Sequence, residues 1–167
     1  FFKQKTAYDK TPSPITDALT TEGISLHFDE NHIPDDIKDA NSQSVLIVYT
    51  PAVSETSLQL TFFASKKWNI LKRAGLLGLI TEDAYTIAVA GTHGKTTTSS
   101  ILAHILNYSD IYCTAFLGGI SSNYNTNLIL SELGNIIVVE ADEYDRSFLK
   151  LSPDISIITS LDPDHLY

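Results

Sequence analysis

The segment AVAGTHGKTTTSS, residues 88–100, constrains the fold of this chain more than any other feature. It continues a β-branched, apolar run over residues 85–90 that predicts a buried strand, and helical periodicity resumes over residues 99–106. Glycines between a strand and a helix let backbone N–H groups close on phosphate oxygens at the positive N-terminus of the helix. The segment therefore predicts a phosphate-binding loop in an α/β fold.

The loop matches the standard pattern G-x-x-x-x-G-K-[ST] only in part, because Val89 occupies the first glycine position. In such loops the lysine places a charge on the β- and γ-phosphates and the next hydroxyl ligates Mg²⁺. We expect ATP and Mg²⁺ as cofactors; a chance Gly-Lys-Thr at a helix start is the alternative. The predicted nucleotide-binding residues are Gly91, Thr92, His93, Gly94, Lys95, Thr96 and Thr97.

Strand-like and helix-like runs alternate along the chain, which predicts doubly wound parallel sheets of the α/β class. We expect two units: residues 1–83, a partial Rossmann-like domain without its opening glycine-rich unit, and residues 84–167, a partial phosphate-loop domain. Strands are predicted over residues 45–50, 85–90, 113–117, 135–140 and 155–160. Residues 118–127 are expected to form a polar loop after a strand.

Composition excludes several classes of protein. The chain has 43% apolar residues, enough for a packed core, and 19% charged residues, too few for a disordered or coiled-coil protein. A net charge of −9 disfavours nucleic acid as a partner. No apolar run approaches the ~18 residues of a membrane span, so we expect no membrane insertion. The single cysteine, Cys113, cannot form an internal disulfide and indicates a cytoplasmic location.

Acidic residues gather where a predicted strand ends, in the segment EADEYD that begins at Glu140. Four carboxylates within six residues repel one another, and a divalent cation would relieve that repulsion. Because parallel strands bring their carboxyl ends to one edge, we expect Glu140 about 4–7 Å from the Thr96 hydroxyl, across a shared cation. His165 follows the strand over residues 155–160 at the same edge. An exposed acidic turn and a solvated histidine are the alternatives.

The motifs GTHGKTTT, EADEYDRSFL and DPDHL together resemble those of the Mur ligases, which use ATP to add amino acids to peptidoglycan precursors. YDKTPSPITDAL and LGGISSNYNTN are also similar to that family. The resemblance implies catalytic roles for Lys95, Glu140 and His165, with Thr96, Glu140 and His165 as metal ligands. It further implies substrate contacts by Asp9, Asn125, Thr126 and Asn127; for these four, plain loop residues are the alternative.

Within the family, His93 and the flanking motifs are most similar to the member that joins L-alanine to UDP-N-acetylmuramate through an acyl phosphate. The resemblance thus implies these two substrates as partners. A recycling ligase that adds a tripeptide to the same sugar nucleotide remains an alternative, as does a non-catalytic nucleotide-binding switch. Family members are more than twice this length and carry a third domain, so we expect a fragment that is inactive alone. The oligomeric state is left open.

Overall fold

The computed structural model describes residues 5–41, 44–142 and 148–162 and divides the chain into two compact units, residues 1–72 and 73–167. The sequence placed the division at residues 83 and 84, after helix α4 (Arg73–Thr81). The difference arises because Leu77 of α4 packs on Ala88 and Val139 of the second unit. The assignment of the two units as functional domains stays a prediction.

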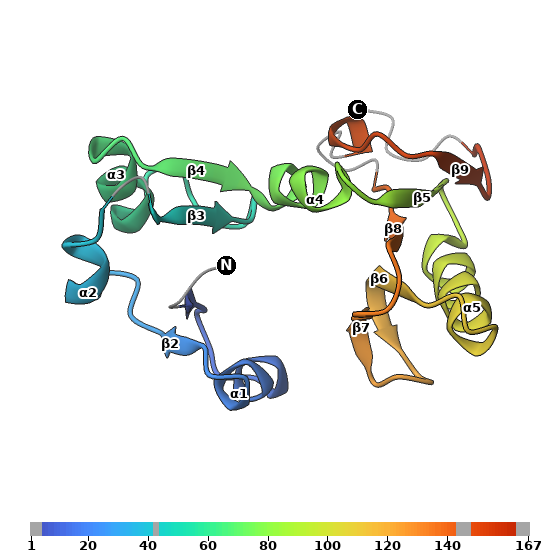
Figure 1. Cartoon of the computed structure of the whole chain (residues 1–167). Helices are drawn as coiled ribbons and strands as arrows, with labels where there is room; N and C mark the ends of the chain where they lie inside the picture. The colour runs from blue at the N-terminus through green and yellow to red at the C-terminus, as the bar shows by residue number, and fades with distance from the viewer. Residues whose placement is uncertain (1–4, 42–43, 143–147, 163–167) are drawn as a thin grey trace. The chain divides into compact units, whose positions relative to one another are not determined.

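The first unit consists of two parallel strand pairs, each joined through a helix, as expected for the α/β class (Figure 1). A capping box starts its first helix: Ser13 Oγ accepts the Thr16 N–H at 3.3 Å, and Ser13 N–H donates to Thr16 Oγ1 at 2.8 Å. The elements in order are β1 (Thr6–Tyr8), α1 (Pro14–Thr21), β2 (Ser25–His27), α2 (Asp35–Lys38), β3 (Leu46–Tyr49), α3 (Leu58–Ser65) and β4 (Asn69–Lys72).

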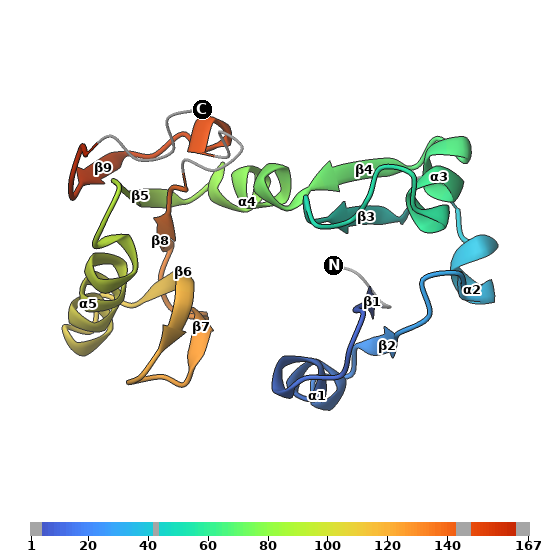
Figure 2. The same cartoon turned by 180° about the vertical axis from the view of Figure 1, so that it is seen from behind.

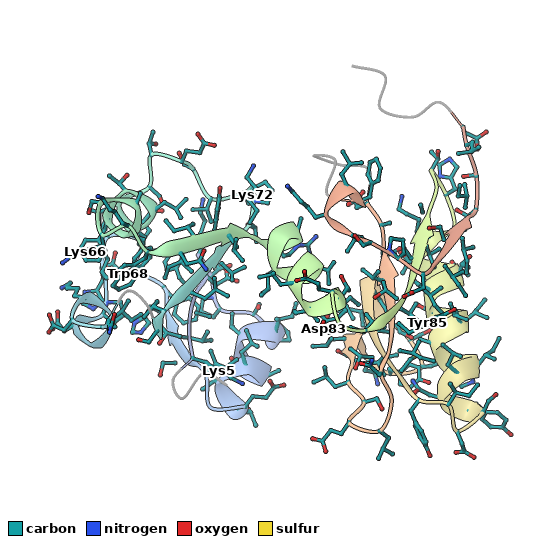
Figure 3. The ribbon with its side chains drawn as sticks, turned by 45° about the horizontal axis from the view of Figure 1, so that its top comes forward. Lys5, Lys66, Trp68, Lys72, Asp83 and Tyr85 are labelled. Carbon is teal, nitrogen blue, oxygen red and sulfur yellow. The ribbon has the colours of Figure 1, made fainter. Side chains whose placement is uncertain are left out.

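Aromatic side chains form the core of the first unit between α3 and the β3–β4 pair. Trp68, labelled in Figure 3, stacks on Phe63 with ring centroids 5.3 Å apart, and Phe62 meets Trp68 edge-on. Ile33 completes the buried cluster. Large, rigid rings bury much apolar area at low entropic cost, which suits a unit with only short strands.

The second unit is built on a five-stranded sheet in the order β7-β6-β8-β5-β9 (Figures 1 and 2). Four strands run parallel, which confirms the predicted parallel sheet, whereas β7 pairs antiparallel with β6 at the edge. The elements are β5 (Tyr85–Ala90), α5 (Lys95–Tyr108), β6 (Cys113–Ser121), β7 (Thr126–Ile129), β8 (Ile136–Glu140) and β9 (Ile155–Ile158).

The predicted loop over residues 118–127 is wrong at both ends, because residues 118–121 belong to β6 and residues 126–127 begin β7. Strand β6 continues through Gly118 and Gly119 to Ser121, where it turns into the β6–β7 hairpin. Asn125, with a φ of 52°, and its N–H bond to the Ser121 carbonyl at 2.7 Å close the turn. A left-handed conformation suits asparagine, so the polar residues form a turn and not an open loop.

Helices cover both faces of the second sheet, as a doubly wound fold requires. Ala103 of α5 packs on Cys113 and Val138 from one side, while Leu77 of α4 packs on Ala88 from the other. Apolar strands buried on both faces hold the carboxyl ends of β5 and β8 in a fixed register. Whatever follows those two strands is therefore held side by side.

Cys113 is fully buried, and burial raises the pKa of its thiol. Because the thiolate is the reactive species, a disulfide-exchange reagent is expected to label the native chain slowly, at a rate limited by opening of the fold, and to label the unfolded chain at once. Ser109→Cys in a Cys113→Ala background gives an exposed thiol as the control. Rapid labelling of native Cys113, as fast as at residue 109, would contradict this burial.

Candidate functional site

The predicted phosphate loop occupies residues 91–94, between β5 and α5. Both of its glycines have a positive φ, 125° at Gly91 and 83° at Gly94, a conformation that other residues adopt only with strain. Gly94 is the N-cap of α5 and has no side chain to cap the first turn. The N–H groups and positive dipole of the α5 N-terminus therefore face the loop, an arrangement that favours an anion.

Lys95, the first residue of α5, folds back over this loop. Its Nζ donates to the Gly91 carbonyl at 2.7 Å, so the ammonium lies above the loop backbone. Lys95 also lines a surface hollow of about 340 Å³. The other residues around the hollow are Ala90, Gly91, Thr92, Ala141, Asp142, Phe148, Ile158, Ser160, Leu161 and Asp162.

Thr96 and Glu140 come together at the carboxyl end of the sheet, as the sequence predicted. Strand β8 lies directly beside β5, with Glu140 paired to Val89, and Thr96 Oγ1 donates to Glu140 Oε1 at 2.6 Å. The expected separation of about 4–7 Å is wrong for this structure, because the hydroxyl donates directly to the carboxylate. The strand register and the first turn of α5 are enough to place the Thr96 and Glu140 side chains next to each other.

Gly118 makes room for the Glu140 carboxylate. A Cβ atom on Gly118 would overlap Glu140 Oε2, whereas one on Gly119 would lie 3.6 Å from Thr96 Cγ2, an ordinary contact. Both glycines belong to β6, the neighbour of β8 on the side away from β5. A glycine inside a strand often marks a close approach, and that signal was available in the sequence.

The two glycines give a matched pair of variants. We expect Gly118→Ala to push the Glu140 carboxylate away from Thr96 and to lower turnover of the full-length protein at least 10-fold, with little change in melting temperature, since a flexible side-chain end can move aside. Gly119→Ala is the control and should leave turnover within about 2-fold. Equal turnover in both variants would show that the carboxylate position does not matter.

The oxygen atoms at this edge fit a magnesium ion. Mg²⁺ prefers a few carboxylate or hydroxyl oxygens together with phosphate oxygens and water, and Thr96 with Glu140 supplies such a pair. Within residues 5–41, 44–142 and 148–162, no group of three or more His, Cys, Asp and Glu side chains forms a closed metal cage. His165, predicted as a further ligand, lies outside the described residues, as do Glu143 and Asp145.

Asp9 belongs to the first unit, directly after β1. Its side chain is exposed, and its Oδ1 accepts the Thr11 N–H at 3.3 Å in a tight turn. Partial burial, followed by the charges of Glu30, Asp29 and Asp9, raises the pKa of Tyr8. The acidic surrounding disfavours a further negative charge next to Tyr8.

Asn125 lies in the β6–β7 turn, and Thr126 and Asn127 begin β7. Phe116 pairs with Val139; β6 then runs five residues to Ser121 and β8 only one to Glu140, so β6 continues past the end of β8. His104 Nδ1 and Tyr124 OH are hydrogen-bonded at 3.0 Å, which ties the turn to α5. The sequence gives no signal for this contact, because the two residues lie 20 positions apart.

Among the helices of the described residues, none is long and apolar enough to cross a membrane.

Comparisons with known proteins agree with this geometry. Residues 89–167 match the Mur ligase middle domain. A UDP-N-acetylmuramate–L-alanine ligase of Porphyromonas gingivalis is 55% identical over 161 residues, which cover 95% of this chain and 35% of the relative. The chain thus spans about a third of the length of the curated relatives it matches.

Two solved structures share the fold across 96% of the chain. The UDP-N-acetylmuramate-alanine ligase of Thermotoga maritima is 28% identical with a TM-score of 0.76, and 36% of it is covered. A UDP-N-acetylmuramate:L-alanyl-gamma-D-glutamyl-meso-diaminopimelate ligase from Neisseria is 21% identical with a TM-score of 0.82, and 53% of it is covered. Taken with the phosphate loop and the strand-end glutamate, the match to the Mur ligase middle domain and the 55% identity to the Porphyromonas ligase lead to one conclusion: the chain belongs to the Mur ligase family.

Proposed function

We propose that this protein is an ATP-dependent ligase that joins L-alanine to UDP-N-acetylmuramate in peptidoglycan precursor synthesis, in the cytoplasm. The names of the curated relatives, at 47–55% identity, support these substrates. The observation that carries the proposal is the 2.6 Å contact between Thr96 Oγ1 and Glu140 Oε1, next to the lysine of a phosphate loop. That combination suits transfer of a phosphoryl group from ATP.

The phosphate loop is proposed to bind the nucleotide. Its backbone N–H groups and the α5 N-terminus attract the phosphates, and the Lys95 ammonium exchanges the Gly91 carbonyl for phosphate oxygens. Thr92, His93 and Thr97 flank this cradle. Catalysis of phosphoryl transfer is chiefly positioning and charge neutralisation, so the lysine is the residue whose charge counts most.

Thr96 and Glu140 are proposed to hold Mg²⁺, which when bound neutralises charge on the phosphates. Because Mg²⁺ requires an ionised carboxylate, Glu140 must give up the Thr96 hydroxyl hydrogen bond or share it. Gly118 leaves the carboxylate the space for that adjustment. His165 remains a proposed participant at the same edge.

The reaction proposed for this site has two steps. A carboxylate oxygen of UDP-N-acetylmuramate attacks the γ-phosphorus of ATP, the bond to the ADP oxygen breaks, and an acyl phosphate forms. The amine nitrogen of L-alanine then attacks the acyl carbon, phosphate leaves with the electron pair, and a proton is released as the amide forms. Asp9, Asn125, Thr126 and Asn127 are proposed to bind the sugar nucleotide.

The test is phosphate release by the full-length protein with ATP and UDP-N-acetylmuramate, with L-alanine, with the tripeptide, or with no amine. Release that depends on L-alanine, together with the amide product by mass spectrometry, is the expected result. Release that depends on the tripeptide instead would establish the recycling ligase. Release independent of any amine would establish a nucleotide-binding switch.

A further inference from the structure

The end of strand β9 forms a support on which the phosphate loop lies. A Cβ atom on Gly91 would overlap Thr159 Oγ1 and lie 2.8 Å from the Ser160 nitrogen. Thr92 N–H reaches the Ser160 carbonyl at 3.4 Å, and Thr92 Oγ1 donates to the Asp162 carbonyl at 2.8 Å. The loop is therefore shaped by residues almost seventy positions later in the chain.

Thr159 fixes which way the peptide groups of the loop face. Its N–H donates to the Ala90 carbonyl at 3.0 Å, and its hydroxyl lies within hydrogen-bond distance of the Ala90 carbonyl, at 3.1 Å, and of the His93 carbonyl. In a trans peptide the N–H points opposite to the C=O. Holding the His93 carbonyl toward β9 therefore turns the Gly94 N–H away from β9, toward the space where phosphate is proposed to bind.

Ser160 makes a contact of a different kind. Its Oγ accepts the His93 N–H at 2.9 Å, and Ser160 also lines the hollow that Lys95 and Asp142 border. A hydroxyl has one hydrogen and two lone pairs, so accepting from an N–H leaves its hydrogen available for donation. Among the residues that the structure describes, no acceptor receives that hydrogen.

We infer that the Ser160 hydroxyl donates a hydrogen bond to an oxyanion bound in the hollow beside Lys95. Two oxyanions meet at such a site, the terminal phosphoryl group of ATP and the carboxylate of the acid substrate, and both accept hydrogen bonds in the same way. Because the His93 N–H orients the hydroxyl before the ligand arrives, the donation costs little reorganisation. This inference rests on the proposed function, since it concerns the same site.

The experiment compares Ser160→Ala with Ser160→Thr, which keeps a hydroxyl, in the full-length protein. Calorimetry gives the Kd of Mg·ATP and Mg·ADP, and steady-state kinetics gives the KM of UDP-N-acetylmuramate. A hydrogen bond to a charged group is strong enough that we expect about a 10-fold loss or more in Ser160→Ala, restored in Ser160→Thr. Ser156→Ala, an exposed position on β9, is the control and should match the wild type.

The readouts separate the two oxyanions. Weaker ATP binding with unchanged ADP binding would assign Ser160 to the terminal phosphoryl group, and a raised KM for UDP-N-acetylmuramate with unchanged nucleotide binding would assign it to the carboxylate. If Ser160→Ala bound ATP and ADP equally more weakly, the inference would be overturned, and Ser160 would only help to shape the loop. Thr159→Val is expected to show that pattern, because Thr159 shapes the loop. No change in any value for Ser160→Ala would also overturn the inference. A wild type that binds neither nucleotide would refute the proposed function itself.

Discussion

Lys95→Ala is expected to abolish ligation while the chain stays folded. The Lys95 side chain is half-buried and belongs to neither apolar core cluster of the second unit, and its Nζ donates to the Gly91 carbonyl of the loop, so its removal leaves no cavity in the core. Loss of a positive charge at a transferring phosphoryl group costs about 2.7–4 kcal/mol at preorganised sites, which corresponds to a 10²–10³-fold fall in kcat. Phosphate release measures the loss, and circular dichroism checks the fold.

The control for this variant is Lys72→Ala, which removes an equal charge at an exposed position in the first unit. It should retain turnover within about 2-fold and show the same melting temperature. Lys95→Arg adds a second comparison, because it keeps the charge but changes the geometry of the donors. A folded Lys95→Ala protein with near-normal turnover would remove the phosphate loop from the catalytic site.

The approach of Glu140 to Thr96 could be predicted because the carboxyl ends of parallel strands meet at one edge of a sheet. Residues 85–90 and 136–139 are mostly apolar and mostly buried, and the strands that contain them are parallel neighbours. The meeting of parallel strand ends at one edge was the only rule needed to place Glu140 near Thr96. The distance between them could not be predicted, since it depends on whether the hydroxyl binds the carboxylate directly.

Glycines misled the prediction of strand β6. Gly118 and Gly119 indicate a loop by local propensity, yet both lie within strand β6. At Gly118 the missing side chain leaves room for the Glu140 carboxylate from the neighbouring strand. This is tertiary structure overriding local preference. The contacts of Thr159 and Ser160 with the loop could not be predicted either, because they join residues 66 to 69 positions apart in the sequence.

Helix α4 shows a further limit of predicting structure from the pattern of apolar residues. Its sequence, RAGLLGLIT, carries apolar residues on most of its surface and so does not reveal which sheet it covers. The predicted boundary, set just before the strand over residues 85–90, left α4 in the first unit, and in the structure Leu77 of α4 packs on the second. Gly78 lets the helix approach the Lys150 carbonyl, where a Cβ atom would lie 2.6 Å away.

Glu140→Gln is expected to raise the magnesium concentration at half-maximal turnover and to lower kcat about 10²–10³-fold, comparable to the loss of another preorganised electrostatic group. The amide keeps the shape of the carboxylate and can still accept the Thr96 hydrogen bond, so the melting temperature should change little. The removed charge is the one that Mg²⁺ requires, since an amide oxygen is a much weaker ligand than a carboxylate. Turnover measured over a magnesium titration reports both effects.

Two further variants decide between a metal role and a purely structural one. Glu132→Gln removes a carboxylate at an exposed position outside the site and should leave the magnesium titration unchanged. Thr96→Val deletes the hydroxyl partner of Glu140 and should weaken the apparent magnesium affinity in the same direction as Glu140→Gln. If Glu140 merely anchors α5 through Thr96, Thr96→Val would lower the melting temperature, and both site variants would leave the magnesium midpoint where it is in the wild type. A shifted midpoint at an unchanged melting temperature identifies the carboxylate at the end of β8 as a magnesium ligand.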